Sequence, residues 1–259
     1  MRAWLRSDAV VRWMSTAIVF VAIAVVAEVP GEDVTALPVV DAAIDQHGGS
    51  VFDASRTRFE VCSKSGCSAV SVTMNHGLFE YDVKAIVRGA ERRVRSTNEA
   101  VELGVDGELV EVEDAQRFRD WAMQRVYFNF LPYRLNDPSV YKEDLGIEMF
   151  HDRALHKVKV TFELGSSTDA SDEFLYWFDP ESARLELFAY SYEVGAGGLR
   201  FRRLFNHRRV GGLMFYDQEN WGVEGKGLSV DLVTPEYIQN EMRHISTVEM
   251  RKISVEGLP

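Results

Sequence analysis

Short segments that alternate apolar and polar residues, separated by tight turns, dominate the chain from about residue 57 onward. The alternation is clear in residues 79–87 and 101–105, and Asp106-Gly107 is a typical hairpin turn. Roughly ten short strands joined by such turns are typical of sandwiches and barrels. Because the chain shows neither a βαβ pattern nor a break in composition, the sequence predicts one mainly β (α+β), antiparallel domain over residues 39–259.

Helical spacing interrupts the strand pattern in a few places. Apolar residues recur at helical spacing in residues 39–47, directly before a Gly-Gly pair that is a typical helix stop. Asp114 is a suitable N-cap for a second helix of residues 115 to about 130, which a Leu-Pro pair ends. A short helix is also expected at residues 235–242, after a strand at residues 230–233.

The N-terminal segment differs from the rest of the chain. Three arginines in the first twelve residues precede an unbroken apolar run, residues 17–27, and a polar linker follows at residues 28–38. This order predicts a signal peptide of residues 1–27, cleaved after Ala27, and export to the periplasm or cell envelope. The alternative is an uncleaved membrane anchor, although the apolar span of about 15 residues is shorter than the roughly 20 that cross a bilayer.

Charge and motifs exclude several function classes. The net charge of −11 without a basic stripe argues against a nucleic-acid partner. The six histidines form no HExxH or HxH pair, and no GxSxG or complete phosphate-loop motif occurs. His151 and His156 lie five positions apart, so on a strand they would point to opposite faces. We therefore expect a monomeric, non-enzymatic protein with no catalytic residue, no cofactor and no metal.

The two cysteines flank a turn of the sequence SKSG. Pairing Cys62 with Cys67 places Phe59 opposite Val70, which gives a hairpin with one half-buried face. A disulfide suits an exported chain, and closing this short loop would contribute about 2 kcal/mol in the chain-entropy model. Free thiols or a metal pair are the alternatives.

Bulky residues occupy both faces of three predicted strands, at residues 174–178, 187–192 and 212–216. A strand that is apolar on both faces is covered on both. One interpretation is a packed sheet with helices on one side. The other is a curved sheet around an apolar cavity, an arrangement that β-rich proteins use to bind hydrophobic ligands.

Several segments resemble a known group of folds. Residues 41–49, DAAIDQHGG, resemble the opening helix of the periplasmic LolA-like group of lipoprotein-sorting folds, and residues 128–138, FNFLPYRLNDP, are similar to a segment of an uncharacterised exported family with that fold. Residues 158–163, 172–179 and 185–190 fit the same order of strands. The resemblance implies a strongly curved antiparallel half-barrel, closed by one or two helices, whose apolar interior binds acyl chains of lipoproteins or other lipids.

These observations predict a cell-envelope protein that binds or carries a lipid or another hydrophobic ligand in an apolar cavity. Contact with the membrane is expected only through the N-terminal segment, if it is not cleaved. The alternatives are an envelope interaction or scaffold protein with a packed core, and an exported hydrolase. Six aromatic residues are expected to line the cavity: Trp121, Phe128, Phe162, Trp177, Phe188 and Tyr190.

Overall fold

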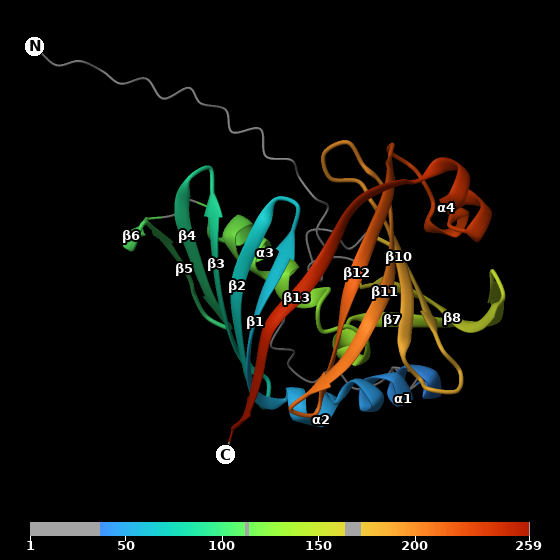
Figure 1. Cartoon of the computed structure of the whole chain (residues 1–259), viewed down its shortest axis with the longest axis horizontal. Coiled ribbons are helices and arrows are strands. Elements are labelled where there is room, and N and C mark those ends of the chain that lie inside the picture. The colour runs from blue at the N-terminus through green and yellow to red at the C-terminus, as the bar shows by residue number, and fades with distance from the viewer. Residues whose placement is uncertain (1–36, 112–113, 164–171, 259) are drawn as a thin grey trace, which may run out of the picture.

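The computed structural model describes residues 37–111, 114–163 and 172–258. Within these ranges the chain forms 13 strands in one open antiparallel sheet, together with four α-helices (Figure 1). The predicted mainly β, curved half-barrel fold is therefore confirmed, with more strands than the roughly ten expected from the pattern. The predicted signal peptide and almost all of the predicted linker lie outside the described residues.

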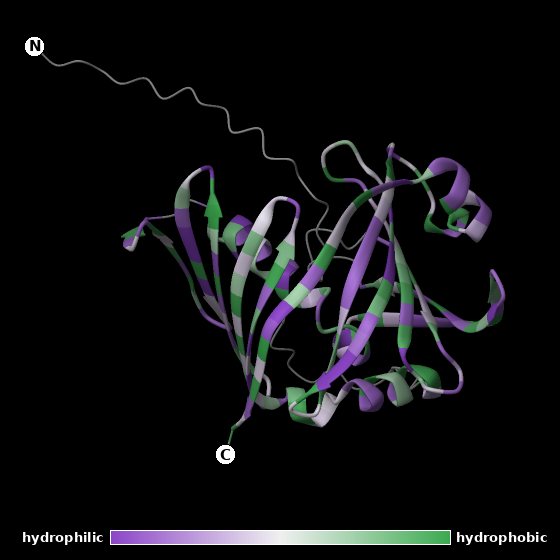
Figure 2. Ribbon diagram, viewed as in Figure 1, coloured by the Kyte–Doolittle hydropathy of each residue, from purple (hydrophilic) through white to green (hydrophobic). Residues whose placement is uncertain are grey.

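Six strands form one half of the sheet. Each is joined to the next by a short hairpin, and they are β1 (Ala54–Ser63), β2 (Gly66–Asn75), β3 (Leu78–Val87), β4 (Ala90–Thr97), β5 (Val101–Val105) and β6 (Glu108–Val110). In β2 every second residue from Ser68 to Met74 is buried, as a strand with one covered face requires. Hydrophobic and hydrophilic bands accordingly alternate along these strands in Figure 2.

Six further strands form the other half. They are β7 (Val140–Phe150), β8 (Arg153–Phe162), β9 (Phe174–Phe178), β10 (Leu185–Tyr192), β11 (Gly198–Val210) and β12 (Leu213–Glu224). All five residues of β9 are buried, so both faces of this strand are covered, as its sequence predicts. The strands β4 and β7 were missed in the sequence, because charged residues occupy many of their exposed positions.

The last strand, β13 (Arg243–Gly257), joins the two halves. Its first part pairs with β12 and its second part with β1, so the partner changes within one strand. The register shifts in both pairings, and such irregularities bend a strand and increase its twist. Figure 1 shows β13 running between two halves that diverge from it. The sheet order is β6-β5-β4-β3-β2-β1-β13-β12-β11-β10-β9-β8-β7, which leaves β6 and β7 at the edges.

Three of the four helices begin within one residue of the predicted position. The helix α1 (Pro38–His47) ends at Gly48, whose φ of 91° is left-handed, and α2 (Gly49–Phe52) follows. The helix α3 (Ala115–Tyr127) is capped by the Asp114 side chain, which accepts from the Arg117 backbone N–H. The helix α4 (Pro235–Glu241) matches the short helix expected there. The helix α3 ends at Tyr127 and not near residue 130, and α2 was not predicted.

The strand predicted at residues 230–233 is wrong. Residues Val230–Leu232 form the 3-10 helix η2, because the Ser229 side chain accepts from the Asp231 N–H and turns the backbone. Val230 and Val233 are buried nevertheless, so their apolar character reflects packing against the sheet and not membership of it. A second 3-10 helix, η1 (Tyr133–Asn136), follows α3.

The sheet separates two hydrophobic cores. The larger core lies on the face covered by α1, α2 and α3, which we call the inner face. The smaller core lies on the opposite, outer face, where η2 and the residues around α4 cover part of β9–β12. No helix within the described ranges is long and apolar enough to cross a membrane.

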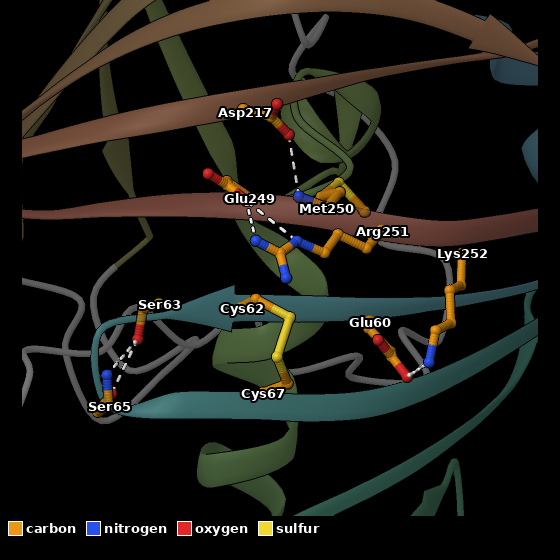
Figure 3. Close-up of a disulfide and its surroundings, with 10 residues drawn as sticks. All are labelled: Glu60, Cys62, Ser63, Ser65, Cys67, Asp217, Glu249, Met250, Arg251 and Lys252. Atoms are coloured by element: carbon orange, nitrogen blue, oxygen red, sulfur yellow. Dashed lines mark hydrogen bonds and ion pairs between the residues drawn. A yellow bond between two sulfur atoms is a disulfide. The ribbon is translucent and has the colours of Figure 1, made fainter.

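Cys62 and Cys67 form a disulfide with an S–S distance of 2.08 Å. The two residues lie directly opposite each other on β1 and β2, and Phe59 lies opposite Val70, so the predicted pairing and register are both confirmed. Figure 3 shows the bridge crossing between the two strands beside β13.

Candidate functional site

One segment fills the inner face of the curved sheet. It comprises α3, the turn after it and η1, and we call residues 115–136 the covering segment. The helix contacts β2, β3, β4 and β5, and it buries Met123 and Val126 against them. The turn after the helix contacts β10 and β12 of the other half and also β1. A single stretch of chain therefore covers an inner face that both halves of the sheet provide.

Aromatic contacts attach the turn of the covering segment to both halves. The Phe128 ring stacks on those of Phe188 and Tyr190, with centroids 5.7 Å and 5.4 Å away. The Phe130 ring meets that of Phe59 on β1 at 5.6 Å and that of Phe215 on β12 at 6.0 Å. Such aromatic pairs add about 0.5–1.5 kcal/mol each beyond the area they bury.

A few buried hydrogen bonds hold the same turn. The Tyr216 hydroxyl lies 3.0 Å from the Phe128 carbonyl oxygen and 3.1 Å from that of Leu131. The Gln218 side-chain amide donates to the Phe128 carbonyl at 3.1 Å and to Asn129 Oδ1 at 2.9 Å. These contacts satisfy carbonyl groups that no longer belong to a helix, as burial requires. Two side chains of β12 therefore fix the position of the turn.

The titratable groups of the inner face are held in their usual charge states. Burial raises the pKa of Tyr127 to about 12 and that of Tyr176 well above its ordinary value, so both phenols are neutral at physiological pH. Burial lowers the pKa of Arg125 to about 10, which still leaves this side chain protonated. The Arg125 guanidinium lies 3.9 Å from the centre of the Trp121 ring and donates to Ser68 Oγ. The inner face thus combines an apolar surface with the cationic side chain of Arg125.

The structure brings five of the six predicted cavity-lining residues to the inner face. Phe128, Phe162, Phe188 and Tyr190 are buried in its core, and Trp121 packs against it at the margin. Phe174 and Tyr176, which were not singled out in the sequence, join the same aromatic cluster. Their alternation within residues 174–178 was the signal that could have found them.

Trp177 lies apart from the other five, on the outer face. It contacts Phe150, with ring centroids 5.7 Å apart, and its indole N–H donates to Glu148 at 2.6 Å. Successive side chains of a strand point to opposite faces of the sheet. Trp177 falls between Tyr176 and Phe178, which both point to the inner face. A ligand on the inner face would not contact Trp177.

The inner face is closely packed in this structure. Two small hollows, both beside Phe52 and Phe130, border the covering segment within the described part of the chain. Each has a volume of about 10 Å³, which is room for about one water molecule. A hydrophobic ligand would therefore take the place of side chains that now fill this space.

Among the described residues, one group has the spacing of metal ligands, Glu60 with Cys62 and Cys67. The thiolate is the form of cysteine that binds metals, and here both sulfur atoms are joined in the disulfide. This group therefore offers a single carboxylate.

The sequence of the chain matches one family model. Residues 58–250 match the model described as a family of unknown function, DUF6503. The chain belongs to this family. The matched range begins in β1 and ends in β13, so the covering segment and both halves of the sheet are part of the family domain. No curated protein matches the chain in sequence.

The backbone of this chain is similar to those of several solved structures, among them the following three. A LolA superfamily protein from Nitrosomonas europaea is 10% identical, with a TM-score of 0.49 over 86% of this chain and 94% of that one. A DUF1329 family protein from Desulfovibrio piger is 9% identical, with a TM-score of 0.46 over 84% and 91%. A putative outer membrane lipoprotein-sorting protein domain from Vibrio parahaemolyticus is 8% identical, with a TM-score of 0.46 over 84% and 92%.

The family model is of unknown function, and two of the three similar structures bear the names of the LolA superfamily and of lipoprotein sorting, the group that the sequence resembles. At 8–10% identity and TM-scores below 0.5, the likeness is one of the backbone.

Proposed function

We propose that this chain is a non-enzymatic protein of the cell envelope that binds a lipid or another hydrophobic ligand on the inner face of its sheet. The observation that carries the proposal is the way this face is covered. Aromatic side chains from both halves converge on it, and the turn that fills the space between them, residues 128–131, is held by a few stacking contacts and hydrogen bonds. The ligand would occupy the space of this turn.

Replacing the turn with a long acyl chain is favourable in free energy. Exposing Phe128 and Phe130 would cost about 2–3 kcal/mol each, and the hydrogen bonds of the turn contribute about 1 kcal/mol each. An acyl chain of about 14 methylenes gains on the order of 10 kcal/mol when it is buried, at about 0.8 kcal/mol per methylene. A long acyl chain can therefore offset the displacement of the turn, whereas a short one cannot.

The predicted export signal supports the location. Residues 1–27 are outside the described part of the structure, so export rests on the positive start and the apolar run in the sequence. The disulfide agrees with it, since disulfides persist in oxidising compartments. That the protein is not an enzyme likewise stays a prediction from the sequence.

A binding experiment tests the proposal directly. The protein recovered after export is stripped of lipid and titrated with a fluorescent fatty acid. We expect saturable binding, and a rise in stability of about 2.7 kcal/mol when the free ligand is at 100 times its Kd. A matched short-chain acid of about six carbons serves as the control and should compete poorly, because it buries too little apolar area. Binding that does not saturate, with no change in Tm, would refute the proposal.

The packed inner face favours a second candidate, an envelope interaction or scaffold protein. Hollows of about 10 Å³ hold no ligand as they stand. Apolar side chains are instead exposed on the edge strand β7, where Tyr141, Ile147 and Met149 are 54–58% exposed. Unpaired edge strands with exposed apolar residues are sites where another chain can pair. Recovery of a stable protein partner, with no lipid bound by the purified complex, would favour this candidate.

A further inference from the structure

Two arginines of β11 point into the inner face. Arg200 and Arg202 are two positions apart and therefore share one face of the strand. They are only 7% and 6% exposed, and the neighbouring Leu199 and Phe201 belong to the core of the outer face. Charged residues are almost never this buried unless they are paired.

The contacts of the two guanidinium groups leave them incompletely satisfied. Arg200 Nη1 donates to the carbonyl oxygens of Leu199 at 3.0 Å and Val223 at 3.4 Å. Arg202 Nη1 donates to Gln218 Oε1 at 3.1 Å. The Arg200 guanidinium also lies 4.7 Å from the centre of the Tyr192 ring and interacts with the hydroxyl of that residue. The Nε of each arginine is buried without a hydrogen-bond partner in the described ranges. Their described contacts are with neutral groups, and burying a positive charge without an anionic partner is costly.

Two further buried polar atoms lie at neighbouring positions on the flanking strands. Tyr190 is directly opposite Arg200 on β10, and Asn220 is directly opposite Arg202 on β12. The Tyr190 hydroxyl and Asn220 Oδ1 are also buried without a partner in the described part of the chain. We call these four residues, Tyr190, Arg200, Arg202 and Asn220, the polar cluster.

A glycine makes room beside the polar cluster. Gly222 lies opposite Arg200 on β12, and a Cβ atom at this position would stand 2.7 Å from Arg200 Nη1. Any other residue would push the guanidinium out of its place. The backbone of β12 is thus compatible with an arginine that lies flat across it.

The polar cluster adjoins the space of the proposed hydrophobic ligand. The ring centroid of Phe128 is 5.4 Å from that of Tyr190 and 5.5 Å from the Arg202 guanidinium carbon. If the turn containing Phe128 is displaced, the aromatic interior and the two arginines become parts of one continuous site. The aromatic part suits an alkyl chain, and the arginines suit the group at its end.

We propose that the polar cluster binds the anionic head group, a carboxylate or a phosphate, of an amphiphile whose alkyl chain lies on the inner face. This inference rests on the proposed function. Guanidinium groups and a phenol hydroxyl donate to anionic oxygens, and Asn220 can turn its amide to donate as well. An anion at this place would pair the two buried charges and satisfy the unpartnered donors.

The wild-type protein tests the inference without any variant. Oleate, oleyl alcohol and oleylamine, which share one alkyl chain, compete for the bound fluorescent fatty acid. We expect oleate to bind at least about tenfold more tightly than the alcohol, as charge-assisted hydrogen bonds are stronger than neutral ones, and oleylamine to bind most weakly. Inorganic phosphate and acetate, tested alone at millimolar concentration, should neither compete nor raise the Tm.

Two substitutions and a matched control test whether the arginines cause the preference for oleate. Arg200→Met and Arg202→Met remove the charge and keep most of the side-chain length, and both should reduce the preference for oleate over oleyl alcohol to within about twofold. The control is Arg203→Met, because Arg203 directly follows Arg202 on the same strand, is 55% exposed and pairs with Glu219. It should keep the wild-type preference.

The outcomes separate this inference from the proposed function. Equal binding of oleate and oleyl alcohol by the wild type would overturn the head-group site and leave the hydrophobic site standing. So would an unchanged preference in both folded variants. Failure of all three compounds to bind would refute the proposed function as well. Saturable stabilisation by inorganic phosphate alone would replace the amphiphile with a free anion. If neither variant folds, the comparison in the wild type decides.

Discussion

His47 is a titratable side chain buried at the end of α1. It is 7% exposed, its Nε2 accepts from the Leu185 backbone N–H at 3.2 Å, and its Nδ1 has no partner in the described structure. Burial, with smaller contributions from the nearby His207 and Arg209, lowers the pKa of His47 from 6.5 to about 3. The folded protein therefore holds this ring neutral where the unfolded chain would protonate it.

This pKa predicts a loss of stability in mild acid. Between pH 6.5 and about 3, His47 binds a proton in the unfolded chain but not in the folded one, so the free energy of unfolding falls as the pH falls. The contribution is up to about 1.4 kcal/mol per pH unit. His47→Gln keeps an acceptor for the Leu185 N–H and should flatten this part of the pH dependence of urea unfolding. His76→Asn, an exposed control, should not. Identical slopes in all three proteins would contradict the assignment.

At Gly48 one structural constraint can be predicted from the sequence and a second cannot. The Gly-Gly pair predicts the end of a helix, and Gly48 does end α1 with a φ of 91°. The structure adds a second constraint, because a Cβ on Gly48 would clash with the carbonyl oxygen of Gly212 in the β11–β12 hairpin. The end of a helix depends on neighbouring residues and can be predicted from the sequence. The close approach of a distant hairpin cannot.

The covering segment is the element on which the proposed function depends. Its helix was predictable from Asp114 and the apolar spacing, both of which act within a few residues. Its position on the inner face was not, since that depends on Tyr216 and Gln218, which lie about 90 residues further along the chain. The same holds for the polar cluster, whose members come from three strands.

Tyr216→Phe should lower the stability of the protein and raise its affinity for the fluorescent fatty acid. The substitution removes the hydroxyl that bonds the Phe128 and Leu131 carbonyls, and we expect a loss of stability of about 1–3 kcal/mol. Because the ligand must displace this turn, a closed form weakened by about 1.4 kcal/mol should bind the fluorescent fatty acid about tenfold more tightly. Thermal unfolding and titration of the same sample measure both quantities.

The control for this experiment is Tyr237→Phe, on α4 and against the core of the outer face. It should leave the affinity for the fatty acid unchanged. A Tyr216→Phe protein that loses stability and gains no affinity would show that the turn is structural and does not cover a binding site.

At the scale of the whole molecule, a single strand determines the shape. The strand β13 pairs with β12 in its first part and with β1 in its second, so the two halves of the sheet diverge and create an inner face wide enough for the covering segment. The sequence predicts a strand there, but pairing between the two ends of the chain is not visible in it. The disulfide, by contrast, joins residues five positions apart and was predicted correctly.

Export is a prediction about the whole chain and has a direct test. Expressed with its own N-terminus in a bacterium that exports proteins, the chain should be recovered beginning at Glu28, because cleavage is expected after Ala27. Its intact mass should also lack two hydrogen atoms, owing to the Cys62–Cys67 disulfide. An uncleaved chain in the membrane fraction would support the anchor instead, and free thiols would contradict the disulfide in that compartment.

The sequence by itself determined the class of fold, most of the strands and helices, the disulfide and the aromatic content of the interior. Each of these follows from interactions between residues close in the chain or from the period of a strand. Only the tertiary structure decided which aromatics share a face, that the turn at Phe128 fills the space between them, and that Arg200 and Arg202 are buried beside it. These features depend on contacts between strands far apart in sequence, whose register and curvature no local pattern records.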